Sequence, residues 1–207
     1  MGDDARHLAR SLRARVGEEI EVVDPAGLML TVRLDRVSPE RVEGRVVAER
    51  EHNPEPTARI VIAVAHLPAP ALELVLSRCT EAGAFGFQIV QADRSVARGS
   101  KHERWRTICR ESAMLAGRLA IPEVAGPSPL GDVLALSEHP VMLVRGAPLR
   151  LAEIAEPQNL TLLIGPEGGW SDREMALVSL KATLGPRNLR ADTAALVALA
   201  IALSRRD

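Results

Sequence analysis

The chain has 207 residues, 46% of them hydrophobic, and a formal net charge of −1, which suits one large or two small domains with a sizeable core. No apolar run reaches the roughly 18–20 residues that cross a bilayer, the charged N-terminus lacks a secretion signal, and the two cysteines lie far apart with no clustered histidines. We therefore expect a cytoplasmic protein with no bound metal, in which Cys79 and Cys109 are buried and reduced.

The first quarter of the chain alternates apolar and polar side chains. This alternation covers residues 18–23, 28–37 and 41–50, with turns rich in Pro and Gly between them. A period of two residues is typical of strands with one buried face, so we expect a small antiparallel β-domain over residues 1–52. The segment His52–Pro56, with two prolines, indicates a linker.

The pattern changes after the linker. Arg59–Ala65 is a continuous apolar run, which is typical of a strand buried on both faces. Alternation of such strands with helical patterns predicts an α/β domain over residues 57–207, with a mostly parallel sheet and helices on both sides. The further elements expected are helices at 70–82 and 101–119 and short strands at 87–90, 141–144 and 160–164.

Two loops near the C-terminus each follow an apolar run, begin with Gly-Pro and precede a helix. Residues 165–170 read GPEGGW, and residues 185–190 read GPRNLR. Glycine allows a ligand to approach the backbone closely, and proline stiffens the turn. The alternative is a pair of ordinary strand-to-helix turns. The charged side chains of Glu167, Arg187 and Arg190 among the glycines favour one binding site built largely from main chain.

The same loops exclude two familiar phosphate sites. The first loop does not spell G-x-G-x-x-G, and neither loop contains the lysine of a phosphate-binding P-loop. The ligand is therefore not expected to be held by phosphates. Beyond the first loop, Ser171 and Glu174 fit a capping box that begins a helix, and Asp192 or Thr193 is expected to cap the last helix.

The two loops carry a resemblance to a known family. Residues 165–174, GPEGGWSDRE, and residues 184–194, LGPRNLRADTA, are similar to the paired motifs of the RsmE-type RNA methyltransferases of the SPOUT superfamily. Weaker similarity extends over Glu81–Gly83, Arg94–Val96 and residues 7–20. The resemblance implies an S-adenosylmethionine-dependent enzyme that methylates N3 of a uridine in bacterial 16S rRNA, within the small ribosomal subunit.

The resemblance also implies a fold and an assembly. Residues 1–52 would form a PUA-like β-barrel that binds RNA, and residues 57–207 a SPOUT-type sheet with a C-terminal trefoil knot. The family works as a homodimer. The chain departs from the family at 114–118, where MLAGR replaces the usual Glu-Gln-Ser/Cys-x-Arg, and it lacks the family's first strand. These departures leave one alternative open, namely a non-catalytic RNA-binding or ribosome assembly factor that retains the fold.

The expected cofactor residues follow from the ligand's chemistry and from the family. S-adenosylmethionine carries an adenine, a sulfonium and an amino acid head, and an adenine fits between apolar side chains while loop amides contact its edge. Each apolar residue could instead serve core packing. The cofactor-binding residues expected are Leu143, Val144, Leu163, Ile164, Gly165, Gly168, Gly169, Leu184, Gly185 and Leu189.

The catalytic candidates follow from the chemistry of uridine. N3 must lose its proton before methylation, and the resulting charge is delocalised onto O2 and O4. Arg187 and Arg190 could stabilise that charge, because a guanidinium is a permanent, planar cation. Glu167 or Asp192 could accept the proton. The structural alternatives are a helix N-cap for Asp192 and a loop carboxylate bonded to nearby amides for Glu167.

Arginines gather in two parts of the sequence, near the N-terminus and between residues 92 and 118. Local basic patches on a nearly neutral protein suit contact with a phosphate backbone. Solvated helix faces are the alternative for each single arginine. The RNA-binding residues expected are Arg10, Arg13, Arg94, Arg98, Arg104 and Arg118.

Overall fold

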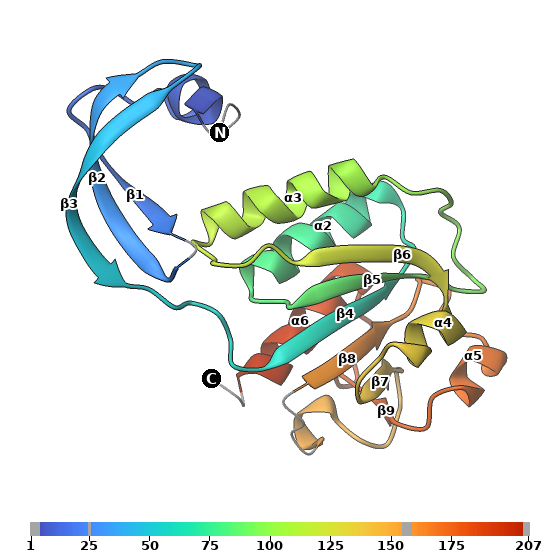
Figure 1. Cartoon of the computed structure of the whole chain (residues 1–207). Coiled ribbons are helices and arrows are strands. Elements are labelled where there is room, and N and C mark those ends of the chain that lie inside the picture. The colour runs from blue at the N-terminus through green and yellow to red at the C-terminus, as the bar shows by residue number, and fades with distance from the viewer. Residues whose placement is uncertain (1–4, 25, 155–158, 205–207) are drawn as a thin grey trace. The chain divides into compact units, whose positions relative to one another are not determined.

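The computed structural model describes residues 5–24, 26–154 and 159–204. The chain divides into two compact units, Met1–Pro54 and Glu55–Asp207 (Figure 1). Within the described residues, no helix combines the length and the apolar character needed to cross a membrane.

The first unit is a small antiparallel sheet. A short π-helix, η1 (His7–Ser11), precedes the strands β1 (Glu19–Asp24), β2 (Leu28–Val37) and β3 (Val42–Glu51). The antiparallel β-domain expected from the alternating pattern is therefore confirmed. The strand order is β1-β2-β3, so β1 and β3 are both edges. A barrel closes only when its outer strands pair, so closure of this sheet into the expected barrel stays a prediction.

The second unit contains a six-stranded parallel sheet in the order β6-β5-β4-β8-β7-β9 (Figure 1). The central strand β4 pairs with β5 on one side and β8 on the other, and Ile60 and Ile62 on β4 are fully buried. This position explains why the strand is apolar throughout. The strands are β4 (Arg59–Ala65), β5 (Gly86–Gln91), β6 (Glu123–Pro129), β7 (Pro140–Leu143), β8 (Asn159–Ile164) and β9 (Lys181–Ala182).

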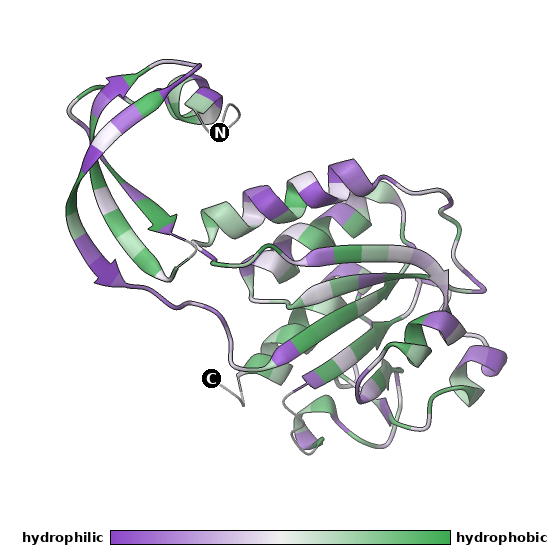
Figure 2. Ribbon diagram, viewed as in Figure 1, coloured by the Kyte–Doolittle hydropathy of each residue, from purple (hydrophilic) through white to green (hydrophobic). Residues whose placement is uncertain are grey.

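Three longer helices pack together beside this sheet. Helix α2 (Ala69–Glu81) contacts both α3 (His102–Leu115) and α6 (Ala191–Leu203), and α6 also contacts β4 and β8. Figure 2 shows the result in hydropathy, since α6 and the central strands are apolar while α3 carries many hydrophilic residues. The shorter helices are α4 (Leu130–Ala135), η2 (Leu151–Glu153) and α5 (Asp172–Ala176).

The sequence pattern predicted most of these elements but missed two strands. Strand β6 contains Gly126, Pro127 and Pro129, which resemble a loop in sequence. Prolines are tolerated there because β6 is an edge strand and need not donate every ladder hydrogen bond. Strand β9 has only two residues, too few for any periodic pattern.

Both cysteines are buried in the core as free thiols, as expected. Burial raises the pKa of the Cys79 thiol to about 12. Burial also raises the pKa of Cys109, although a hydrogen bond with Thr80 and the charge of Arg118 act in the opposite direction. Both groups are therefore neutral at physiological pH and serve packing.

Candidate functional site

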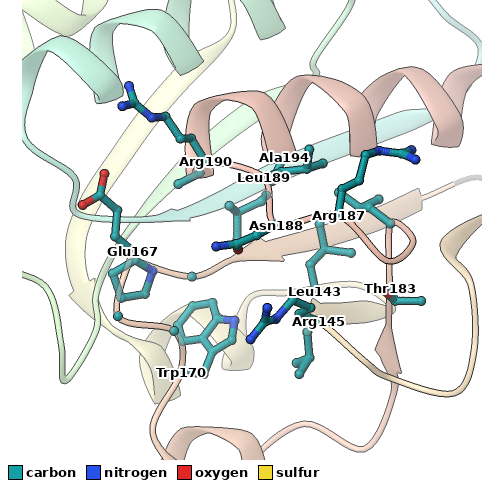
Figure 3. A pocket seen from close by; sticks show the side chains of 18 of the residues that line it. Leu143, Arg145, Glu167, Trp170, Thr183, Arg187, Asn188, Leu189, Arg190 and Ala194 are labelled. Atoms are coloured by element: carbon teal, nitrogen blue, oxygen red, sulfur yellow. The ribbon is translucent and has the colours of Figure 1, made fainter.

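The carboxyl ends of β7, β8 and β9 meet at one edge of the sheet, where a cavity of about 560 Å³ opens (Figure 3). Ligands of open parallel sheets bind at this edge. Both Gly-Pro loops line the cavity, the first after β8 and the second after β9, and Leu143–Arg145 line it after β7. The two loops thus contribute to a single cavity, which we call the loop pocket.

The expected cofactor residues line the loop pocket with one exception. Leu163 does not line it, because it is fully buried in the core of the second unit. Successive side chains of a strand point to opposite faces, so Ile164 faces the pocket and its neighbour Leu163 faces the core. The expected residues that line the pocket are Leu143, Val144, Ile164, Gly165, Gly168, Gly169, Leu184, Gly185 and Leu189.

Trp170 forms part of the pocket wall and carries an unused hydrogen-bond donor. The residue is only 5% exposed, and its indole Nε1 is buried with no hydrogen-bond partner among the described residues. The indole lies against the backbone of Gly165, where an added Cβ would come within 3.0 Å of Nε1. A buried donor without a partner is costly, so this N–H is an unsatisfied polar group in the pocket wall.

The first loop turns tightly at Gly169. Its amide donates to the Pro166 carbonyl at 2.8 Å, and its φ of +71° lies in the left-handed region that favours glycine. A Cβ at Gly169 would meet no atom within 4 Å. Backbone conformation, and not crowding, therefore requires glycine at this position.

Arg94 fixes this loop from outside. Its Nη1 donates to the Gly168 carbonyl at 2.7 Å and to the Trp170 carbonyl at 3.3 Å. Arg98 donates to the carbonyls of Ser95 and Ala97 in its own loop. Both arginines, expected to bind RNA, use donors on the protein's own main chain. For Arg94 the contact ties the segment after β5 to the pocket wall.

A second set of contacts ties the same two segments together. The capping box is confirmed, since the Ser171 hydroxyl accepts from the Glu174 amide and Glu174 accepts from the Ser171 amide. Glu174 is 1% exposed and also accepts from the amide of Asp93 at 2.9 Å. Hydrogen bonds from Arg173 and Ser171 hold the pKa of the Asp93 carboxyl below its usual value. The loop that contains Glu167 is thus firmly anchored at its end.

Three of the four catalytic candidates line the loop pocket. Figure 3 shows Glu167 and Arg190 at one end of it and Arg187 at the other. In the described part of the chain, none of the three makes an ion pair or a side-chain hydrogen bond, so Glu167 is not bonded to nearby amides. Because Arg187 and Arg190 do not converge, they cannot stabilise the same ligand oxygen in this arrangement.

Asp192, the fourth candidate, lies outside the loop pocket. Helix α6 begins at Ala191, its N-cap is Arg190, and no side chain caps it. The expectation that Asp192 or Thr193 would be the N-cap is therefore wrong, because the helix begins earlier than the residue types suggest. Asp192 accepts a hydrogen bond from the amide of Thr193 at 2.9 Å and lines a smaller hollow together with Glu167 and Arg190.

Several pocket residues escaped the sequence interpretation. Arg145 is the second residue after β7, and the rule that ligands bind beyond the carboxyl ends of parallel strands would have indicated it. Trp170 ends the first loop and could have been recognised by its place in the motif. Asn188 lies within the second Gly-Pro loop and could have been recognised by its place in the motif. Thr183 and Met175 carry no sequence signal, because they reach the pocket only through the path of the chain.

Arg118 contradicts its expected role in RNA binding. Its side chain is 5% exposed, pairs with Glu55 at 2.6 Å, and donates to the carbonyls of Thr80 and Ala84, both at 2.9 Å. Burial alone would raise the pKa of Glu55, but the bond and charge of Arg118 and the amides of Ala120 and Leu119 together lower it. Arg118 is a structural clamp with no surface to offer to a phosphate.

The remaining RNA candidates are more accessible. Arg104 pairs with Glu73 at 2.8 Å, but its side chain is 54% exposed. Arg10 and Arg13 belong to the first unit and are exposed. RNA binding by these three arginines stays a prediction.

Comparison with known proteins assigns each of the two units to a domain family. Residues 53–203 match the RNA methyltransferase domain family, and residues 2–46 match the RNA methyltransferase PUA domain family. Ribosomal RNA small subunit methyltransferase E of Mycobacterium bovis is 32% identical over 218 residues, which cover 96% of this chain and 82% of that protein. The corresponding protein of Synechocystis is 31% identical, with 94% of this chain and 68% of that protein covered.

The chain is also similar in fold to solved structures of methyltransferases. Ribosomal RNA small subunit methyltransferase E from Neisseria gonorrhoeae, solved with S-adenosyl methionine, has a TM-score of 0.87 and 25% identity over 97% of this chain and 88% of that chain. A Legionella pneumophila protein solved with bound cofactor SAM has a TM-score of 0.89 and 26% identity over 99% of this chain and 90% of that chain.

Fold, pocket and matched domains define an RNA methyltransferase domain preceded by a PUA domain. The two domain matches together extend over most of the chain, and the curated relatives align with nearly all of it. The chain belongs to the family of ribosomal RNA small subunit methyltransferase E, the RsmE family that the two loop motifs indicated.

Proposed function

We propose that this chain methylates N3 of a uridine in bacterial 16S rRNA, with S-adenosylmethionine as the methyl donor. The observation that supports this most strongly is the loop pocket, in which both family motifs meet around a carboxylate and guanidinium groups that have no side-chain partner among the described residues. The family relationship, at about the 30% identity of the curated relatives, supports the choice of reaction.

The residues present suit this cofactor. Leu143, Ile164 and Leu189 offer apolar walls for an adenine. Gly169 and Gly185 line the same pocket and leave open space where a side chain would otherwise lie. The buried indole N–H of Trp170 supplies a donor that only a ligand or water can satisfy. When bound, S-adenosylmethionine supplies an electrophilic methyl group. The trefoil knot around this pocket stays a prediction of the family resemblance.

The catalytic work assigned to the chain is proton removal and charge stabilisation. A carboxylate, Glu167 or Asp192, accepts the proton from N3, and the guanidinium of Arg190 stabilises the charge that spreads to the uracil oxygens. The separation of Arg187 from Arg190 in Figure 3 favours Arg190 for this role. Arg187 then remains available to a different part of the bound ligands.

The test is direct. Purified protein is incubated with S-adenosylmethionine and small ribosomal subunits from cells that lack this methylation, and the rRNA nucleosides are analysed by mass spectrometry. We expect new 3-methyluridine. A chain that binds rRNA but shows no cofactor binding by calorimetry at millimolar concentration would instead be a non-catalytic RNA-binding or assembly factor.

We also propose that the active form is a homodimer. Helix α6 is apolar over nearly its whole length, yet Ala200 is exposed and Leu196, Val197 and Ile201 are only partly buried. An apolar helix is expected to be covered on more than one side. Sedimentation equilibrium of the wild type and of Ala200→Arg tests this. We expect a dimer for the wild type and a shift toward monomer for the variant.

A further inference from the structure

A second, smaller hollow opens beside the loop pocket. Its volume is about 210 Å³, and it shares Glu167, Arg190 and Ala191 with the loop pocket. The other walls come from the start of α2, the residues just before it, and Asp192 of α6. We call it the α2 hollow. The shared residues place it next to the space assigned to the cofactor.

The walls of the α2 hollow are apolar and stiff. Pro68 and Pro70 flank the beginning of α2, Leu67 is 2% exposed, and Leu74 is 44% exposed. Proline rings have little conformational freedom to lose when a ligand packs against them. Such a surface suits the face of a flat, uncharged ring.

The rim of the α2 hollow is charged. Glu167 and Arg190 point toward the same end of the site, and neither has a side-chain partner in the described ranges (Figure 3). Asp192 adds a second carboxylate, one oxygen of which accepts from the amide of Thr193. The hollow therefore offers both an acceptor and a donor beside its apolar walls.

We propose that the α2 hollow receives the target uracil, an assignment that rests on the proposed methylation of uridine N3. The pairing edge of uracil presents N3–H between two carbonyl oxygens. A carboxylate of Glu167 or Asp192 accepts the N3 proton, and Arg190 donates to an adjacent carbonyl oxygen. Pro68, Pro70 and Leu74 pack against the ring.

The same arrangement selects uracil over cytosine. Cytosine carries a lone pair at N3 where uracil carries a hydrogen, so a carboxylate at this position would face an acceptor and repel it. Enzymes that modify a base take it out of the stack and hold it in such a pocket, so we expect the uridine to be splayed out of the RNA.

Filling the hollow separates base binding from cofactor binding. Ala71 lines the α2 hollow and does not line the loop pocket. We expect Ala71→Phe to keep its affinity for S-adenosylmethionine by calorimetry, while the rate of 3-methyluridine formation falls about 100-fold because the base is misplaced. The matched control is Ala69→Phe, at an exposed position of the same helix outside the hollow, which should retain both properties.

A second variant tests the proposal independently, in case Ala71→Phe does not fold. Leu74→Glu lies at a partly exposed position and adds a negative charge beside the two carboxylates, so it should give the same loss of transfer with intact cofactor binding. Full methylation by either variant would overturn the assignment of the hollow. A wild-type protein that forms no 3-methyluridine would instead overturn the proposed function itself.

Discussion

The arginines between residues 94 and 118 and those of the second Gly-Pro loop look alike in sequence but have different surroundings. Arg94 and Arg118 donate to main-chain carbonyls, and Arg118 is also paired with Glu55. Arg187 and Arg190 line the loop pocket and have no side-chain partner within the described residues. Arg94 and Arg118 therefore hold parts of the protein together, while Arg187 and Arg190 are free to act on a ligand.

This difference shows that the density of charge in a sequence does not identify a nucleic-acid surface. A buried guanidinium whose three nitrogens all donate to protein oxygens, as in Arg118, is not accessible to a phosphate. The informative feature is an unpaired cation at a cavity, which depends on tertiary structure. Substitution of single arginines should therefore affect stability in one group and the reaction in the other.

The largest effect on stability is expected for Arg118→Ala. Removing one partner of a buried ion pair costs about 3–5 kcal/mol, and this change also leaves the Glu55 carboxylate and two carbonyls without their donor. Arg104→Ala is the control, because its exposed pair with Glu73 contributes about 0–1 kcal/mol. Urea denaturation measures both, and equal losses for the two variants would contradict the buried clamp.

Arg94→Ala should weaken cofactor binding in the loop pocket. Without the two hydrogen bonds to Gly168 and Trp170, the first loop loses its outer support, and we expect affinity for S-adenosylmethionine to fall about tenfold. Arg98→Ala should leave the affinity unchanged, because Arg98 contacts only its own loop. If calorimetry gave both variants the wild-type affinity, and RNA binding alone fell, Arg94 would return to the RNA-binding group.

Trp170→Phe should have a smaller effect on the same measurement. Phenylalanine keeps an aromatic ring against Gly165 but removes the N–H, so we expect a loss of about fivefold in cofactor affinity, or ~1 kcal/mol. Thermal unfolding of the free protein should not be lowered, since the removed donor has no partner there. An unchanged cofactor affinity would show that the indole N–H does not contact the ligand.

The smallest expected effect is the contribution of Glu55 to the pH dependence of the free energy of unfolding. The pKa of Glu55 is lower in the folded protein than its ordinary value, because the bond and charge of Arg118 and two amides outweigh burial. The ion pair therefore stabilises the fold above the unfolded-state pKa, and this contribution is lost as the pH falls through the folded-state pKa. Glu55→Gln should flatten the acid limb of the stability curve, and an unchanged limb would contradict this.

Local patterns predicted much of the fold. The strand Arg59–Ala65 follows from its continuous apolar run, and the helix that begins at Asp172 follows from the capping box of Ser171 and Glu174. The outer strands of the second unit were harder, since β6 is interrupted by prolines and β9 is very short.

The site residues that belong to the two loop motifs could be predicted from the sequence. Contacts between segments that are distant in the sequence could not. Glycines and charged residues of the two loops indicated the loop pocket. The structural contacts of Arg94 and Arg118 could not be inferred, because their partners, Gly168 and Glu55, lie far away in the sequence. Leu163 was misplaced because the sequence does not say which face of β8 borders the cavity.

Arg190→Ala tests the central claim most directly, through two measurements on one variant. If the pocket arginine acts on the substrate, its unfolding free energy should match that of the wild type, while kcat for 3-methyluridine formation in small ribosomal subunits falls about 100-fold, as for loss of one charge-stabilising donor. Retention of full methylation together with a large loss of stability would contradict the account, because Arg190 would then be a structural clamp like Arg118.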